Sequence, residues 1–326
     1  MKILLHDPYG LKFTQDMKDW WEAQGHEVKY ERYYNPKLAN EWADVIWFDT
    51  CDNNIASATN PGQALLADDA NYMPWDLHNM DLTGKKVIVR PIDIEVWQGN
   101  QQAAKWDLFD DIIFIADHIK EVCDISSLPE LNPKTKIHTI PCGVNLDRYK
   151  FKKRKPGFNI AIISEKWNSK GTHLLLQVIL KLHRQDPRYK FHWLGQRSDS
   201  NWEYAYFDDF VEHHKLPIEF TNILLEDMTV DQFLEDKNFL LHGSVKEAFS
   251  YAIAEAMTKG IKPIPHRFFG ADAIWENTWD TIDEAVEMIL EDEYDSNSYR
   301  QYLTDHGYTL PQMMQKFDAI LNNKEK

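Results

Sequence analysis

Short apolar runs alternate with amphipathic segments along most of the 326-residue chain. Apolar runs bounded by turn residues are typical of buried strands, and apolar residues three and four positions apart are typical of helices. Strands that alternate with helices in this way indicate parallel sheets with helices on both faces. The predicted strands cover residues 1–6, 27–30, 45–48, 86–89, 109–115, 159–163, 190–194, 218–220, 239–242 and 262–265. The predicted helices cover residues 14–24, 116–123, 171–183, 207–214, 230–236, 250–259, 282–291, 298–306 and 311–322.

The length of the chain and one basic run predict two domains. A chain of 326 residues exceeds what one ordinary core holds. The run KFKKRKPG at 150–157 is almost free of apolar residues and ends in Pro-Gly, which is typical of a solvated linker. We therefore predict an N-terminal domain over 1–154, a C-terminal domain over 155–308 and a last helical segment over 309–326.

The charge balance argues against some partners. The chain has 36 basic and 52 acidic residues, a net charge of −16, which disfavours proteins that neutralise nucleic-acid phosphates or anionic lipid. No stretch reaches the roughly 20 apolar residues of a membrane-spanning helix, and the start MKILLHDPYG lacks the apolar region of a signal peptide. Three widely spaced cysteines form no metal motif or disulfide framework. We expect a cytoplasmic protein without a membrane segment.

The most informative segment for chemistry is KEAFSYAIAEAMTKGIKPI at 246–264. A helix that starts at Ser250 would point the backbone N–H groups near Phe249, Ser250 and Tyr251 toward an anion such as a diphosphate. Glu255 would then lie roughly 7.5 Å along the helix, where its carboxylate can accept hydrogen bonds from a ribose. Glu247 precedes the helix and can face the group beyond the phosphates. On spacing alone, two solvated glutamates on an amphipathic helix are the favoured explanation of this pattern.

This segment resembles the Glu-x7-Glu region of the retaining glycosyltransferases of family GT4. The matching residues are Glu247, the turn at 249–250, Glu255-Ala256-Met257, Gly260 and the apolar strand at 261–264. Two further stretches agree in order and separation. KIHTIPCGVNLDRY at 136–149 is similar to the family's interdomain segment. IAIISEKWNSKG at 160–171 is similar to its first C-terminal strand and phosphate loop, with Lys170 and Gly171 as the Lys-Gly pair. The resemblance covers roughly residues 105–290.

The resemblance implies the α/β GT-B fold, in which two Rossmann-like, doubly wound domains face a cleft. It implies that the C-terminal domain binds a nucleotide-sugar donor, that the N-terminal domain binds the acceptor, and that the last helix packs back on the N-terminal domain. By matching position, Glu255 would bind the ribose, Glu247 the hydroxyls of the donor sugar, and Lys170 the diphosphate. Lys170 and a helix start can stabilise the leaving diphosphate without a metal. No Asp-x-Asp metal motif is apparent, so we expect no metal and no cofactor.

The sequence departs from the family pattern at two places. Where the family has Gly-Arg, this chain has Ser164 and Glu165, and Lys166 is the candidate to supply the missing positive charge. The family's histidine at the end of an N-terminal strand is absent from VIVRPIDIE at 87–95. Asp93 or Arg90 could line the cleft there, although each could equally be a surface residue or a member of a structural pair.

Two weaker candidates depend on position alone. His118 follows the strand at 112–115, where we expect an exposed helix start. Gly10 lies in the turn DPYGLK at 7–12, which corresponds to a loop that is usually rich in glycine and approaches the donor phosphates. An ordinary strand–helix turn accounts for Gly10 equally well.

The function that we expect is retaining transfer of a sugar from a UDP-, GDP- or ADP-linked donor to an acceptor hydroxyl. No enzymic nucleophile is evident, which favours front-side displacement. The acceptor class is a glycan, a lipid-linked glycan or a small molecule, and a modified DNA base fits the acidic balance less well. Two alternatives stay open because of the departures: a sugar-nucleotide epimerase on the same architecture and a non-catalytic nucleotide-sugar-binding protein.

Overall fold

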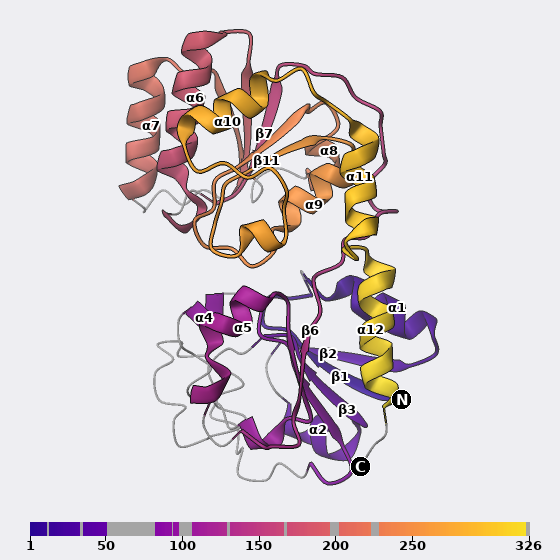
Figure 1. The fold of residues 1–326 in the computed structure, drawn as a ribbon. Coiled ribbons are helices and arrows are strands. Elements are labelled where there is room, and N and C mark those ends of the chain that lie inside the picture. Colours follow the sequence, from indigo (N-terminus) through magenta and orange to yellow (C-terminus); the bar gives the residue numbers. More distant parts are fainter. Residues whose placement is uncertain are drawn as a thin grey trace. The chain divides into compact units, whose positions relative to one another are not determined.

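The computed structural model divides the chain into two compact units. Unit 1 comprises Met1–Gly143 and Leu310–Lys326, and unit 2 comprises Val144–Thr309 (Figure 1). Residues 144–154, which the sequence analysis assigned to the N-terminal domain, belong to unit 2. The structure describes residues 1–11, 13–32, 35–50, 82–92, 94–97, 106–128, 131–165, 168–195, 202–222 and 228–323.

Unit 1 is built on a six-stranded parallel sheet of order β2-β1-β3-β4-β5-β6. The order reverses between β1 and β3, so the crevice for a ligand is expected at the carboxyl ends of these strands. The strands are β1 (Lys2–His6), β2 (Glu27–Glu31), β3 (Val45–Phe48), β4 (Lys86–Val89), β5 (Asp111–Phe114) and β6 (Lys136–Thr139). The helices are α1 (Gln15–Ala23), α2 (Pro36–Glu41), α4 (Ile94–Trp97), α5 (Asp117–Cys123) and α12 (Leu310–Asn322).

The last helix, α12, completes the core of unit 1. Its apolar residues share one core cluster with α1 and with the central strands, and it lies beside α1 (Figure 1). Phe317 contacts the ring of Trp47 with centroids 4.9 Å apart. Asp318 accepts hydrogen bonds from the indole nitrogens of Trp20 (3.0 Å) and Trp21 (3.2 Å). The helix is therefore held to unit 1 by both apolar and polar contacts.

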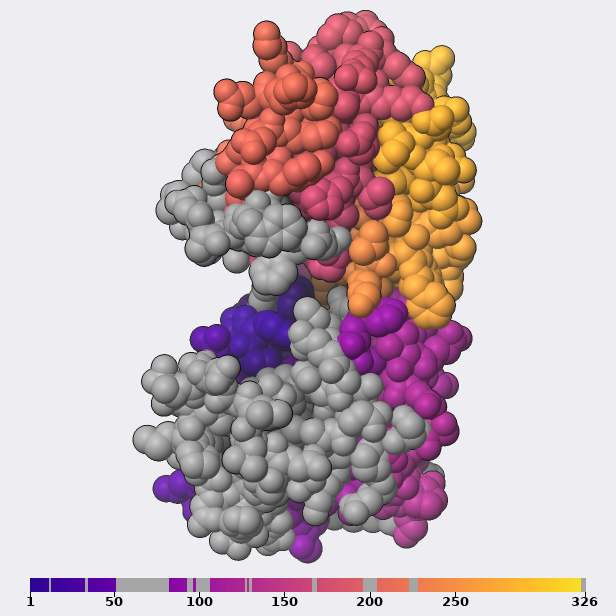
Figure 2. Space-filling model, turned by 90° about the vertical axis from the view of Figure 1, so that its left-hand side faces the viewer, coloured from indigo at the N-terminus to yellow at the C-terminus, as the bar shows by residue number. Residues whose placement is uncertain are grey.

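Unit 2 is built on a five-stranded parallel sheet of order β11-β10-β7-β8-β9, which reverses between β10 and β7. α6 packs against α7 and α10, and α9 packs against α11. α7 and α11 lie on opposite flanks of the unit (Figure 1), and Figure 2 shows the unit from the α7 side. The strands are β7 (Asn159–Ile163), β8 (Lys190–Gly195), β9 (Ile218–Asn222), β10 (Phe239–His242) and β11 (Lys262–Pro265). The helices are α6 (Thr172–Gln185), α7 (Trp202–His214), α8 (Val230–Phe233), α9 (Tyr251–Thr258), α10 (Ile282–Leu290) and α11 (Ser296–Asp305).

The sequence analysis did not predict β6, α2 and α4 of unit 1, and for β6 and α2 the reason can be identified. β6 has the sequence KIHT and is exposed or half-buried at every position, so it shows no apolar run. α2 has only six residues, and it starts through Pro36 and a hydrogen bond from the Leu38 N–H to the Asn35 side chain (3.2 Å). In the described part of the chain, no helix is long and apolar enough to cross a bilayer.

The basic run at 150–157 is more than a solvated linker. Arg154 is only 9% exposed, and its guanidinium donates to the backbone carbonyls of Lys259 (3.1 Å), Glu235 (3.0 Å) and Lys237 (2.7 Å). These carbonyls belong to residues that follow α8 and α9. Arg154 therefore ties the start of unit 2 to the segments after these helices through a buried side chain, whereas Lys152 and Lys153 are exposed.

We expect Arg154→Ala to lower the free energy of unfolding by about 2–4 kcal/mol, because it leaves several buried carbonyls without a charged donor. Urea unfolding followed by tryptophan fluorescence measures the change. Lys153→Ala, at an exposed position in the same run, serves as the control and should stay within about 0.5 kcal/mol of the wild type. Equal stability of the two variants would contradict the structural role of Arg154.

Candidate functional site

Two loops of unit 2 meet at the point where its strand order reverses. Gly171 precedes α6 and has a φ of +66°, and a Cβ atom there would lie 1.9 Å from the carbonyl oxygen of Gly243, which follows β10. The N–H of Val245 donates to the carbonyl of Ser169 at 2.9 Å. The loop before α6 is thus clamped onto the loop after β10, and only glycine at 171 permits so close an approach.

This contact brings Lys170 and Glu247 together, although 76 residues separate them in the sequence. Lys170 Nζ lies 2.8 Å from Glu247 Oε2, and Ser244 Oγ donates to the same oxygen at 3.1 Å. His242, the last residue of β10, places Nε2 3.7 Å from it. The Glu247 side chain is 12% exposed, whereas that of Lys170 is 32% exposed. A nearly buried carboxylate therefore faces a cation that solvent and ligands can reach.

The environment of Glu247 keeps it ionised. Burial would raise the pKa of its carboxyl, but the positive charge of Lys170 and the neighbouring His242 outweigh burial and lower it to about 2. A charged carboxylate is suited to accept hydrogen bonds from sugar hydroxyls.

The start of α9 lies just after Glu247. Ser250 is the N-cap residue, as its position predicts, but its backbone is left-handed (φ 67°) and its side chain makes no capping hydrogen bond. Phe249 is buried against Trp275 and Tyr308, and its carbonyl accepts from the Trp275 indole at 3.0 Å. Tyr251 is half-buried with its ring edge toward Phe249. The aromatic rings thus fix the helix start, and any contact of Phe249 with an anion would come from its backbone.

Glu255 lies within α9 and has a partner that the sequence analysis missed. The hydroxyl of Tyr149 donates to Glu255 Oε1 at 2.6 Å. Tyr149 is buried, and it is the last residue of the segment 136–149, one of the stretches that resemble the family. The position of Tyr149 at the end of that segment was the only signal in the sequence, because its partner lies 106 positions further along the chain.

The remaining predicted site residues are not part of this cluster. Lys166 and Asp93 lie outside the described residues. Gly10 lies in unit 1, in the turn after β1, with a φ of +79° and no atom within 4 Å of where its Cβ would be.

The carboxyl edge of the unit 1 sheet carries buried polar groups. Arg90 forms two hydrogen bonds with Asp49, of 2.7 and 2.8 Å, and both side chains are fully buried. Arg90 is therefore part of a buried ion pair with a structural role, and its guanidinium is not exposed at the surface. His118 is also buried, which corrects the expectation of an exposed helix-start residue. It lies on the inner side of α5, next to Ile119 in the sequence.

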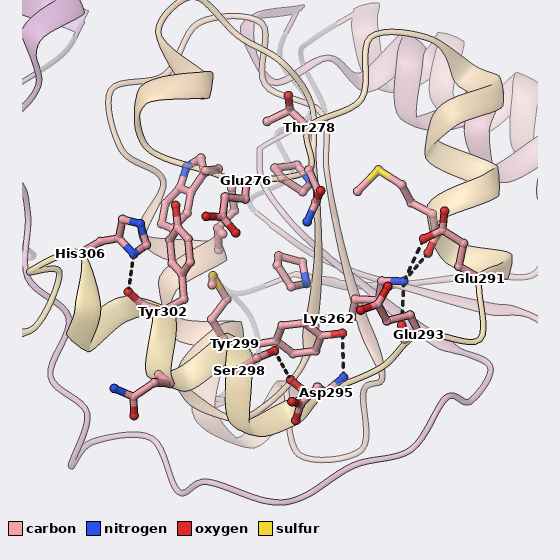
Figure 3. A pocket seen from close by; sticks show the side chains of 18 of the residues that line it. Lys262, Glu276, Thr278, Glu291, Glu293, Asp295, Ser298, Tyr299, Tyr302 and His306 are labelled. Atoms are coloured by element: carbon pink, nitrogen blue, oxygen red, sulfur yellow. Dashed lines mark hydrogen bonds and ion pairs between the residues drawn. The ribbon is translucent and has the colours of Figure 1, made fainter.

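A separate pocket of about 830 Å³ lies on unit 2 beside β11, α10 and α11 (Figure 3). Tyr299 and Tyr302 line it together with Lys262, whose Nζ is held by the carbonyls of Met288 (2.7 Å) and Glu293 (3.0 Å). None of the residues of the Lys170–Glu247 cluster lines this pocket. Its carboxylates would repel an anionic ligand: Glu276, Glu284, Glu287, Glu291, Glu293, Asp295 and Asp305. Among the described residues, no group of three acidic, histidine or cysteine side chains could hold a metal ion.

We expect Gly171→Ala to destabilise unit 2 by about 2–4 kcal/mol, because the new methyl group would overlap the Gly243 carbonyl and force the two loops apart. Gly307→Ala is the matched control, since Gly307 has a similar φ of +77° but open space around its Cβ position. The control should lose only the roughly 1–2 kcal/mol of a left-handed alanine. Urea unfolding compares the variants, and equal losses would contradict the close loop contact.

Acid should weaken the contribution of Glu247 to stability. The folded pKa is about 2, below the ordinary value of 4.5, so the contribution is complete above about pH 5 and is lost as the pH falls toward 2. The stability advantage of the wild type over Glu247→Gln should therefore shrink between these values in thermal unfolding. Glu212→Gln, at an exposed position of α7, gives the background. An advantage that stays constant across this range would argue against a charged pair.

Comparisons with known proteins bear on the fold. No protein-family model and no curated protein matches the sequence. Among solved structures, the chain is similar to HepE of Anabaena in complex with UDP, with a TM-score of 0.70 at 15% identity over 98% of this chain and 99% of that one. It is also similar to sucrose-phosphate synthase from Thermosynechococcus elongatus, with a TM-score of 0.69 at 11% identity over 98% of each chain.

A glycosyltransferase from Rickettsia africae ESF-5 is similar over 99% of both chains, with a TM-score of 0.67 at 14% identity. Identities this low establish the architecture alone. Together with the two parallel sheets, they show that this chain has the GT-B fold, with two Rossmann-like α/β units.

Proposed function

We propose that the chain is a glycosyltransferase that moves a sugar from a nucleotide diphosphate sugar to an acceptor hydroxyl with retention of configuration. The observation that carries this proposal is the Lys170–Glu247 pair at the carboxyl edge of unit 2, next to the start of α9. A cation, a helix start and a charged carboxylate in this place suit a diphosphate joined to a sugar.

In this proposal, different residues of unit 2 bind different parts of the donor. Lys170 and the N–H groups at the start of α9 hold the diphosphate, with Lys166 as a second cation. Glu255, oriented by Tyr149, accepts from the ribose, and Glu247 accepts from the hydroxyls of the donor sugar. The UDP bound in the HepE structure is consistent with this class of donor, while the base stays open between UDP, GDP and ADP.

The transfer step is a front-side displacement. The bond between the anomeric carbon and the terminal phosphate oxygen breaks, and a bond from the acceptor oxygen forms on the same face of the sugar. The acceptor proton passes to a phosphate oxygen of the leaving group. Lys170 and the dipole of α9 stabilise the charge that develops on the diphosphate, so we propose that no metal or other cofactor takes part.

The acceptor site belongs to unit 1 in this proposal, with Asp93 among its lining residues. A glycan, a lipid-linked glycan or a small molecule supplies the hydroxyl. We place the reaction in the cytoplasm, because the three cysteines of the sequence are widely spaced, odd in number and form no disulfide framework.

Nucleotide binding gives the first test. A thermal-shift panel of UDP, GDP and ADP should contain one nucleotide that stabilises the protein by about 2.7 kcal/mol at 100 times its dissociation constant. Lys170→Ala should weaken that binding about 10- to 100-fold, because it removes a charged contact to phosphate. Lys153→Ala should bind as the wild type does. Absence of any shift would contradict the donor site.

Product analysis separates the alternatives. Incubation with a nucleotide sugar and a panel of acceptors, followed by nuclear magnetic resonance of the anomeric proton, should show a glycoside with the configuration of the donor. Glu247→Gln should lower kcat strongly while nucleotide binding persists. A changed sugar nucleotide without acceptor would indicate an epimerase, and tight binding without turnover in any mixture would indicate a binding protein.

A further inference from the structure

His242 is a buried histidine whose ring has no hydrogen bond within the described part of the chain. It is 6% exposed, and neither Nδ1 nor Nε2 has a hydrogen-bond partner there. Its ring and that of Phe268 pack edge to face at a centroid distance of 6.2 Å. Buried polar groups without a hydrogen bond are costly and rare in folded proteins. This position, at the end of the central strand β10, therefore calls for a functional explanation.

Among the residues that the structure describes, the charged and titratable groups near His242 come from three segments. Glu247, in the loop after β10, has Oε2 3.7 Å from Nε2, too far for a hydrogen bond but within reach of a small side-chain movement. Lys170, before α6, occupies that carboxylate oxygen at 2.8 Å. His266 follows β11 and donates from Nδ1 to the Ser244 carbonyl at 2.9 Å.

His266, the second histidine of this region, is disfavoured as a proton carrier. Burial lowers its pKa most strongly, its hydrogen bond to Ser244 opposes this, and the charge of His242 lowers it further. His242, in contrast, lies beside the carboxylate of Glu247. Of the two histidines, His242 is therefore the one placed to donate to that carboxylate.

The proposed function makes two demands on Lys170. In this structure its ammonium group neutralises Glu247, whereas donor binding requires the same group at the diphosphate. When Lys170 turns to the phosphates, Glu247 stays nearly buried with its main positive partner weakened, which is costly for a carboxylate. Protonation of Glu247 would remove the charge that it needs to hold the donor sugar.

We propose that His242 is a positioning residue that takes up a proton from solvent and replaces Lys170 as the cationic partner of Glu247 when a nucleoside diphosphate engages Lys170. This inference rests on the proposed function. Nε2 donates to Glu247 Oε2 in the bound state, so the carboxylate keeps its charge and orientation. Donor binding is then coupled to protonation, and affinity falls as the pH rises above neutrality, because the proton must be supplied at lower concentration.

Calorimetry measures this coupling directly. The nucleoside diphosphate that binds best in the panel of UDP, GDP and ADP is titrated at pH 7.5 in phosphate and in Tris, whose ionisation enthalpies differ. The difference in binding heat gives the number of protons taken up. The wild type should take up more protons than His242→Gln, with a difference approaching one per nucleotide. Subtracting the variant removes the ionisation of the nucleotide itself.

Two further variants secure the assignment. Glu247→Gln removes the carboxylate that requires a cation, so it should lose the same uptake, and this comparison does not depend on the folding of His242→Gln. His266→Gln should keep the uptake of the wild type. Equal uptake in the wild type, His242→Gln and Glu247→Gln would overturn the inference, as would loss in His266→Gln alone. Absence of binding heat with every nucleotide would instead overturn the proposed function.

Discussion

The close contact between the loop before α6 and the loop after β10 is the constraint on which the site of unit 2 depends. Because Gly171 lies against the Gly243 carbonyl, Lys170 reaches a carboxylate from a distant part of the sequence. Backbone contact at this distance is rigid, so the cation and the carboxylate are positioned before any ligand arrives. The buried rings of Phe249 and Trp275 fix the start of α9 in the same neighbourhood. Side chains that bind are thus held by main-chain geometry and aromatic packing.

Elements with a strong local signal could be predicted from the sequence. The central strands are buried throughout because helices cover both sheet faces, and each of them contains a predicted apolar run. β6 could not be found this way, since an edge strand with polar side chains has no such run. α2 is short, and the main sequence feature that indicates a helix there is the cap with Pro36 at its start. The local sequence pattern reflects which residues are buried, so it does not identify elements that are only partly buried.

The same distinction applies to the candidate site, where some residues could be predicted from local sequence and others could not. Glu247, Glu255 and Lys170 stand in segments whose order and spacing resemble a known family, and the structure places Lys170 against Glu247. Tyr149 contacts Glu255 from a distant part of the sequence, and no local pattern indicates such a contact. His118 was misjudged because a helix start suggests exposure, whereas α5 turns this residue inward. The charge of −16 also proved uneven: the acidic pocket beside β11 concentrates carboxylates away from Lys170.

The assignment of α12 to unit 1 has a consequence for biosynthesis. Unit 2 is continuous in the sequence, whereas the core of unit 1 includes Met313, Met314 and Phe317 from the far end of the chain. During translation, the first 143 residues leave the ribosome long before the helix that covers Trp21 and Trp47. The nascent first unit must wait with an open apolar surface while unit 2 forms, so this protein reverses the usual order in which N-terminal domains mature first. Chaperones that shield apolar surface would therefore be needed for longest at the N-terminal part of this chain.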